Sequence, residues 1–275
     1  MNKTRKNNNI CKFIGLLLLV SCVLSWTIVT SYSEPGDLGE PASSFELGSA
    51  NRLEGRNVIV CFYVDTPESS WKTSEIDNTI KDMKIACTFI EDTALKYGIE
   101  TSFEYDWSIG GKNRCLYHRA KIPFLTDETD ASDDLMGEYI EKWVSYLPSF
   151  DSVKEAYDAD NVFMIVFLSQ NGRSYSLVYD GEDSVNESIE IYKGENPSSM
   201  AHEILHLFGA HDYYEGAEYT EDVVSYIKKK YPNEIMLTTQ MGKGKIPQMV
   251  SDITAYHLGW IDSVEELKDF PQLTR

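Results

Sequence analysis

Two histidines and a glutamate within residues 197–212, PSSMAHEILHLFGAHD, have a spacing that suits metal chemistry. His202 and His206 are four residues apart, so on a helix they differ by about 40° around the axis and face the same way. Two imidazoles one turn apart can reach a single metal ion. Glu203 would lie beside that ion, where it can take a proton from a metal-bound water. The spacing therefore predicts an HExxH helix, the arrangement found in zinc peptidases.

The residues around this motif carry the signals of a helix start and a helix end. Asn196 can cap the helix, and Pro197 suits its first position. We therefore expect a helix over 198–208. Gly209 follows, three residues after His206, where the helix must end and the chain must turn sharply. Glycine permits the left-handed backbone conformation that such a turn requires.

The motif extends to HExxHxxGxxD, because Asp212 lies three residues after Gly209. With this extension the segment resembles the metzincin clan of zinc endopeptidases, in which a glycine-turned chain delivers the third metal ligand. The usual third ligand is His, so the chain is most similar to the Asp-bearing branch, which includes snapalysin and the immune-inhibitor-A-like peptidases. The resemblance implies one Zn²⁺ held by His202, His206 and Asp212. Specific residues match the family's motif over about 16 residues, whereas over the rest of 55–275 only the expected arrangement of helices and strands is similar.

Three further assignments around the motif stay open. His211 directly precedes Asp212 and could coordinate in its place, although the register favours Asp212. The resemblance also implies a methionine turn beneath the metal, for which Met236 is favoured over Met241. A tyrosine could donate a hydrogen bond to the developing oxyanion, and the tyrosines at 213, 214 and 219 are not separated on sequence alone.

The composition excludes some classes of partner. The 275 residues include 44 acidic and 25 basic side chains, which gives a formal net charge of −19. This balance argues against a nucleic-acid partner, because there is no excess of Lys and Arg to displace phosphate counterions. Apolar residues make up 42% of the chain, which is enough to bury a core.

Residues 1–33 have the pattern of an export signal or a membrane anchor. Four basic residues precede Phe13–Thr30, a stretch without charge. A basic start followed by an apolar run is typical of a signal peptide, and this run is just long enough to span a bilayer instead. A lipoprotein signal ending at Cys22 is a third reading. All three place the remaining chain outside the cytoplasm, in the extracellular space or on the cell surface, with membrane contact only through this segment.

Residues 34–54 are rich in Gly, Pro, Ser and Ala and are predicted to be a linker, and 55–275 form the predicted catalytic domain. The fold class is predicted to be α/β (α+β). We expect a mixed, twisted sheet of about five strands with packed helices, including the HExxH helix, and a smaller helical C-terminal subdomain. The expected strands are 57–65, 101–107, 161–168, 174–179 and 188–192. The other expected helices are 74–97, 132–147 and 251–260, and 106–112 and 127–134 are expected to be loops.

Together these features predict an exported zinc metalloendopeptidase. A zinc-activated water would hydrolyse peptide bonds of a peptide or protein substrate, with Glu203 as the general base. An edge strand over 174–179 would pair with the extended substrate. The alternative is a cell-surface module that contains zinc and binds a partner with little or no turnover. Glu203 argues against it, since a structural zinc site needs no general base. The oligomeric state is not predicted.

Overall fold

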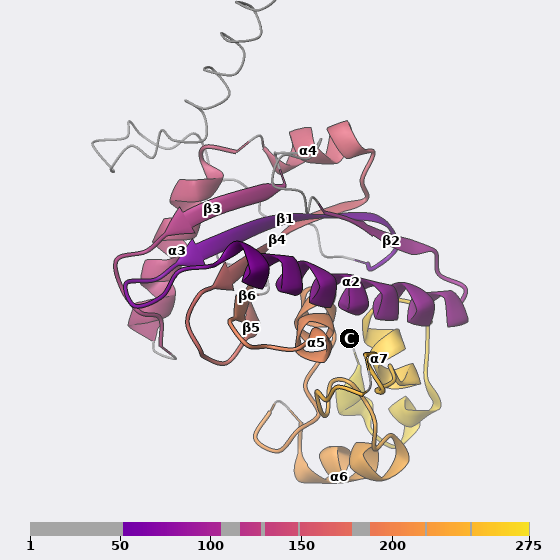
Figure 1. Cartoon of the computed structure of the whole chain (residues 1–275). Coiled ribbons are helices and arrows are strands. Elements are labelled where there is room, and N and C mark those ends of the chain that lie inside the picture. The colour runs from indigo at the N-terminus through magenta and orange to yellow at the C-terminus, as the bar shows by residue number, and fades with distance from the viewer. Residues whose placement is uncertain are drawn as a thin grey trace, which may run out of the picture. The chain divides into compact units, whose positions relative to one another are not determined.

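The computed structural model describes residues 52–105, 116–127, 130–147, 149–177, 188–217, 219–242 and 244–274 (Figure 1). These residues belong to one unit, Ser43–Arg275. The predicted signal or anchor at 1–33, the linker up to residue 51 and the predicted loop at 106–112 lie outside them. Over the described ranges, no helix combines the length and the apolar character needed to cross a bilayer.

The centre of the fold is a mixed sheet, as predicted, and it contains six strands in the described part of the chain. Their order is β2-β1-β4-β6-β5, and β3 also pairs with β1. β2 and β3 follow one another along the same side of β1. Among the described strands, only the edge strand β5 is antiparallel to its neighbour, β6. The strands are β1 Gly55–Asp65, β2 Thr101–Glu104, β3 Tyr117–Lys121, β4 Asn161–Leu168, β5 Tyr175–Leu177 and β6 Ser188–Tyr192.

Helices cover both faces of this sheet (Figure 1). α2 (Thr73–Lys96) and α5 (Pro197–Leu207) lie on one face, and α3 (Asp130–Val144) and α4 (Phe150–Tyr157) lie on the other. The chain after α5 was predicted to be mainly helical, but its helices are short and irregular segments join them within the described residues. It contains α6 (Glu221–Lys230), α7 (Asp252–His257) and the short 3-10 helices η1 (Glu265–Lys268) and η2 (Pro271–Leu273).

The two central strands are apolar over 58–64 in β1 and 162–168 in β4, because these parts are buried on both sides. In β1, Val58 and Val60 pack in the cluster under α3 and α4, whereas Ile59 and Cys61 pack in the cluster that includes α2 and α5. β4 alternates in the same way, and all eight of its residues are buried. A strand between two helical layers has no solvent face, so its sequence does not alternate between apolar and polar residues.

Four sequence expectations need correction. β3 and α4 were not predicted, because they carry few apolar positions: only one residue of β3 is buried, and two of α4. The segment 127–134 is not a loop throughout, since α3 begins at Asp130. An acidic sequence is compatible with a first helical turn, where the helix dipole favours negative charge. The predicted strand 101–107 ends at Glu104 within the described residues.

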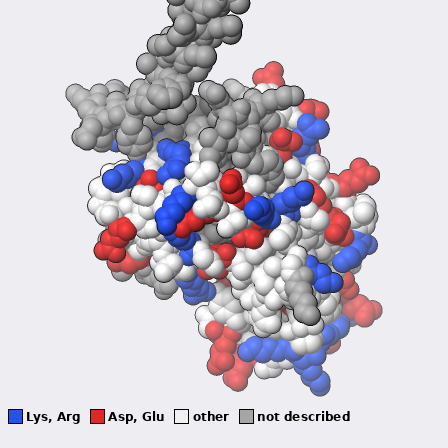
Figure 2. Space-filling view, viewed as in Figure 1, with Lys and Arg blue, Asp and Glu red and all other residues white. Residues whose placement is uncertain are grey.

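Charge on the surface is mixed. Figure 2 shows acidic and basic side chains interspersed over the visible face. The excess negative charge is therefore not gathered in one patch on this face.

Candidate metal centre

The helix that carries the histidines starts where its capping residues require. The side-chain oxygen of Asn196 accepts hydrogen bonds from the backbone N–H groups of Ser198 (2.8 Å) and Ser199 (3.3 Å). Pro197 occupies the first turn, where its missing N–H costs nothing. These local interactions begin α5 and set the direction in which His202 and His206 project.

The end of α5 depends on Gly209. Its φ of 94° lies in the left-handed region, and a Cβ there would lie 3.2 Å from the carbonyl oxygen of His257. The N–H of Gly209 donates to the His206 carbonyl, and the N–H of Ala210 donates to the Leu205 carbonyl. The chain therefore turns back at once and brings residues 210–212 alongside the last turn of the helix.

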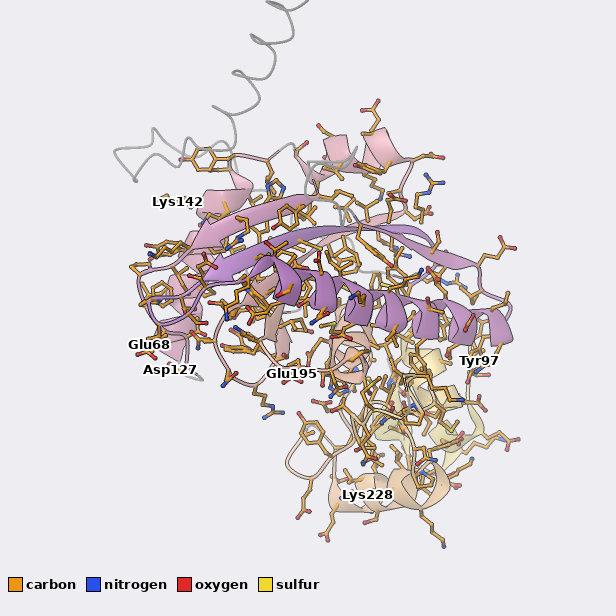
Figure 3. All side chains as sticks on the ribbon, in the orientation of Figure 1. Glu68, Tyr97, Asp127, Lys142, Glu195 and Lys228 are labelled. Atoms are coloured by element: carbon orange, nitrogen blue, oxygen red, sulfur yellow. The ribbon has the colours of Figure 1, made fainter. Side chains whose placement is uncertain are left out.

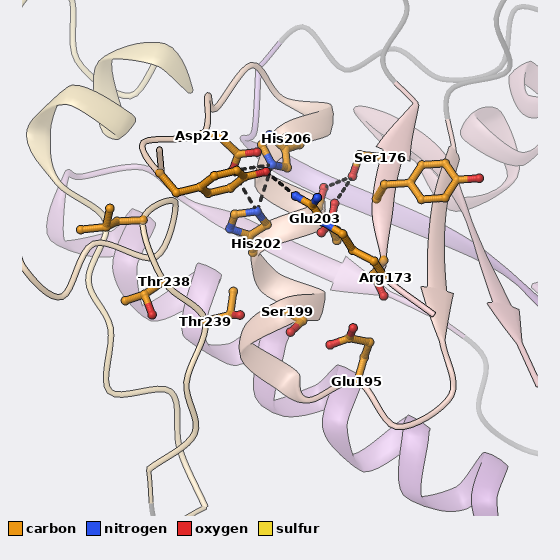
Figure 4. A pocket seen from close by; sticks show the side chains of 14 residues that line it. Arg173, Ser176, Glu195, Ser199, His202, Glu203, His206, Asp212, Thr238 and Thr239 are labelled. Atoms are coloured by element: carbon orange, nitrogen blue, oxygen red, sulfur yellow. Dashed lines mark hydrogen bonds and ion pairs between the residues drawn. The ribbon is translucent and has the colours of Figure 1, made fainter. Parts of the chain in front are cut away.

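This turn brings three possible metal ligands together (Figure 4). The Nε2 atoms of His202 and His206 are 3.0 Å apart. The Oδ1 atom of Asp212 lies 3.2 Å from Nε2 of His202 and 3.3 Å from Nε2 of His206. All three side chains are largely buried, with exposed fractions of 10%, 18% and 18%. Among the described residues, His202, His206 and Asp212 form a group that could hold a metal ion.

The hydrogen bond made by Nδ1 of each imidazole determines which of its two nitrogens carries the hydrogen. Nδ1 of His202 lies 3.0 Å from the Ile235 carbonyl oxygen, and Nδ1 of His206 lies 2.7 Å from that of Ala210. A carbonyl oxygen only accepts, so each Nδ1 carries the hydrogen. Each Nε2 therefore presents its lone pair to the other and to Asp212, which is how metal-binding histidines are oriented.

Three lone-pair atoms facing one another require a cation between them. Oδ1 of Asp212 is buried and lacks a hydrogen-bond donor within the described part of the chain. Burial alone would raise the pKa of Asp212. The neighbouring His202 and His206 have the larger, opposite effect, so the pKa lies well below its usual range. Burial lowers the pKa of His206, but Asp212 and Glu203 outweigh this effect and raise it. The group therefore holds a negative charge that a proton or a metal ion must balance.

The spacing of the three atoms fits a metal ion. Nitrogen and oxygen ligands at about 2.0–2.1 Å from a tetrahedral ion lie about 3.3–3.4 Å from one another. The observed separations are 3.0, 3.2 and 3.3 Å. His211, the alternative third ligand, is not in this group. Its ring lies against those of His257 and Tyr219, at centroid distances of 4.8 and 5.8 Å.

Glu203, in α5, lies beside the group and contacts the edge strand of the sheet. The hydroxyl of Ser176, in β5, is 2.9 Å from Oε2 of Glu203 and 2.8 Å from its backbone carbonyl (Figure 4). Both residues line a pocket of about 520 Å³ that also contains the three candidate ligands. Ser176 was not singled out from the sequence, although it lies on the expected edge strand 174–179.

The structure separates the three tyrosines near the motif. Tyr213 is fully buried, and its hydroxyl lies 3.1 Å from Nδ1 of His257. Tyr219 stacks on Tyr213 at a centroid distance of 5.7 Å. Tyr214 instead lines the pocket, and its hydroxyl accepts a 2.5 Å hydrogen bond from Arg173. Burial and the nearby Asp212 raise the pKa of Tyr214 to about 12, so its phenol keeps its proton at neutral pH.

Met236 lies in a turn whose backbone contacts the ligand residues. The carbonyl of Met236 accepts a 2.9 Å hydrogen bond from the N–H of Tyr213, next to Asp212, and the carbonyl of Ile235 faces His202. Met236 is fully buried, whereas Met241 is partly exposed. These contacts place the turn that contains Met236 directly against the group.

A buried carboxylate that the sequence did not indicate holds this turn. Glu234 is fully buried and accepts hydrogen bonds from the N–H of Ser251 (2.5 Å), the hydroxyl of Thr254 (3.1 Å) and the N–H of Met236 (3.4 Å). Burial raises the pKa of Glu234 to about 7, against the effect of these bonds. Its position next to the apolar pair Ile235-Met236 was the only signal of burial in the sequence.

Comparison with known proteins adds little to this geometry. No family model matches the chain, and no curated protein matches it. A solved structure described as a chaperone–substrate complex is similar at a TM-score of 0.32 and 15% identity, over 59% of this chain and 24% of that one. Wild-type OgpA from Akkermansia muciniphila is similar at a TM-score of 0.39 and 11% identity, over 80% of this chain and 62% of that one. Both TM-scores are low, and this chain spans less than two thirds of either protein.

Proposed function

We propose that this chain is an exported zinc-dependent metalloendopeptidase. One observation carries the proposal: two histidines with their Nε2 lone pairs directed at a buried carboxylate, with Glu203 beside them in an open pocket. Two nitrogen ligands and one oxygen ligand in tetrahedral spacing suit Zn²⁺, and three protein ligands leave a position for water. A purely structural zinc site has four protein ligands as a rule.

The chain's own residues supply the acid–base and binding parts of the mechanism. A bound zinc ion would lower the pKa of a coordinated water and polarise the scissile carbonyl. Glu203 takes a proton from the attacking water and passes it to the leaving nitrogen. The hydroxyl of Ser176, 2.9 Å away, holds the Glu203 carboxylate in place. Tyr214 keeps its proton at neutral pH and can donate a hydrogen bond to the carbonyl oxygen as negative charge develops there.

The edge of the sheet supports a polypeptide as the substrate. β5 is the terminal strand on the described path of the sheet, and its residues Tyr175 and Ser176 line the pocket. An extended peptide can add to such an edge through main-chain hydrogen bonds. This pairing would hold the scissile bond next to Glu203. The basic and apolar residues at 1–33 support export, with or without retention as an anchor.

The test is metal-dependent hydrolysis by the full-length protein in detergent. The wild type should contain about one zinc per chain and cleave casein or a peptide library, and a chelator should abolish cleavage. Glu203→Gln should keep its zinc and lose about 10²–10⁴-fold in kcat, because Glu203 is a base and not a ligand. The matched control is Glu215→Gln, at an exposed glutamate that does not line the pocket.

Two outcomes would contradict the proposal. Retention of full zinc content in His202→Ala would show that the ion is bound elsewhere. Stoichiometric zinc without cleavage of any peptide would favour the alternative, a zinc-containing binding module at the cell surface.

A further inference from the structure

The pocket continues beyond the candidate ligands to an acidic end. Glu195, labelled in Figure 3, lies on the loop between β6 and α5. It lines the pocket together with Ser199 from the first turn of α5. In Figure 4 the carboxylate of Glu195 points toward Ser199. The segment Leu237–Thr239, directly after Met236, lines the pocket as well. The pocket that Glu203 lines is therefore also lined by a second carboxylate, that of Glu195.

The Glu195 carboxylate is not neutralised by the described residues. Its side chain makes no hydrogen bond and no ion pair with any of them, although Glu195 is half-buried. Neither Arg173, which lines the pocket, nor Lys193, two residues before Glu195, makes an ion pair with Glu195. Nζ of Lys193 lies 3.0 Å from a carboxylate oxygen of Glu75 and over the Trp71 ring. Arg173 donates to the hydroxyl of Tyr214, which also lines the pocket. A partly desolvated carboxylate without a partner favours a cation.

Other residues that line the same pocket suit a long basic side chain. Ser199 and Thr239 carry hydroxyl oxygens that can accept hydrogen bonds, and Leu237 provides an apolar surface. Lysine and arginine combine an apolar stem with a cationic tip that only donates hydrogen bonds. The net charge of −19 would also draw cationic peptides toward the protein at long range.

We propose that Glu195 determines specificity, by binding the ammonium or guanidinium group of a lysine or arginine next to the scissile bond. This inference rests on the proposed peptidase function and names its substrate class. Within the described residues, no hydrogen bond or ion pair joins Glu195 to the candidate metal ligands, so Glu195 acts on the choice of substrate and not on the chemistry.

Matched peptides test this assignment. Fluorogenic peptides that differ only in lysine, norleucine or glutamate, on either side of the cleaved bond, are incubated with the full-length wild type and with Glu195→Gln. We expect the wild type to prefer lysine over norleucine by about tenfold or more in kcat/KM. Glu195→Gln should lose most of that preference and leave the norleucine peptide within about twofold. Glu195→Lys should shift the preference to glutamate, and Glu215→Gln should behave as the wild type.

A binding assay separates this inference from the proposed function. Labelled lysine and norleucine peptides are titrated by fluorescence anisotropy into Glu203→Gln and into the double variant Glu203→Gln/Glu195→Gln. Tighter binding of the lysine peptide that disappears in the double variant supports the acidic pocket, even if no peptide is ever cleaved. Equal binding of both peptides to Glu203→Gln, or a lysine preference that survives Glu195→Gln, would overturn the inference, whatever the hydrolytic activity.

Discussion

Nδ1 of His202 lies 3.0 Å from the backbone carbonyl oxygen of Ile235, which is 33 residues further along the chain. This hydrogen bond connects the helix of the candidate metal centre to the turn that contains Met236. It also directs the Nε2 lone pair of His202 at Asp212. Because the acceptor is a backbone atom, the bond depends on whatever holds the turn in place, and that is the buried Glu234.

Glu234→Ala should therefore weaken both the fold and the metal site. The N–H groups of Ser251 and Met236 and the hydroxyl of Thr254 would lose their acceptor, which we expect to lower the free energy of unfolding by about 3 kcal/mol. A displaced Ile235 carbonyl should lower metal affinity by about 10–100-fold, as loss of a partner to a metal-binding histidine does. Chemical denaturation and competition with a zinc chelator measure the two effects. The exposed Glu265→Ala is the control. Wild-type metal affinity in Glu234→Ala would show that Glu234 does not position His202.

Glu234 should also make stability depend on pH. Burial raises its pKa from 4.5 to about 7 in the folded protein, so the folded state holds this proton more tightly than the unfolded state. The resulting stabilisation is fully present below about pH 4.5 and is lost as the pH rises through about 7. Its size should be on the order of 3 kcal/mol.

Urea denaturation of the metal-free wild type and of Glu234→Gln, from pH 4.5 to 7.5, measures this contribution. Other groups, including His206, titrate in both proteins, so the difference between their free energies of unfolding isolates Glu234. As the pH rises, the free energy of unfolding of the wild type should fall relative to that of Glu234→Gln. A difference that stays constant across this range would mean that Glu234 keeps an ordinary pKa.

The third ligand can be tested with neighbouring residues. Asp212→Ala should weaken zinc binding by at least about a hundredfold, because it removes a ligand and leaves two imidazoles without their carboxylate. His211→Ala should retain nearly wild-type affinity, since its ring packs against His257 and Tyr219 and lies outside the group. Titration of both variants with a competing chelator decides between them. A larger loss in His211→Ala would move the third ligand by one residue.

The two adjacent tyrosines should differ in what they affect. Tyr214→Phe should lower kcat by about 10²-fold, with Tm unchanged, because it removes a hydrogen-bond donor from the pocket. Tyr213→Phe should lower the free energy of unfolding by about 1–3 kcal/mol, because a buried hydroxyl that contacts His257 and Thr254 is lost. Steady-state kinetics and thermal unfolding of both variants separate the roles. Unchanged kcat in Tyr214→Phe would remove Tyr214 from the mechanism.

The sequence by itself determined the parts of the protein that depend on near neighbours. The cap at Asn196, the helix that follows it and the turn at Gly209 were predicted, because capping and turn preferences act over a few residues. The common direction of His202 and His206 follows from their spacing on one helix. Strand β4 was predicted over its full length, since burial on both faces leaves a continuous apolar run. β3 and α4 carry too few buried residues to produce such a pattern.

Only the tertiary structure decided which residues complete the site. Asp212 and His211 are adjacent, and the turn after Gly209 determines which of them reaches the two imidazoles. Likewise, Tyr214 faces the pocket and Tyr213 the core, although their sequence context is almost the same. The Ile235 carbonyl reaches His202 across 33 residues of chain, from a turn that the buried Glu234 holds. Such contacts arise from the packing of elements that are distant in the sequence, and packing leaves no periodic pattern from which side-chain direction can be read.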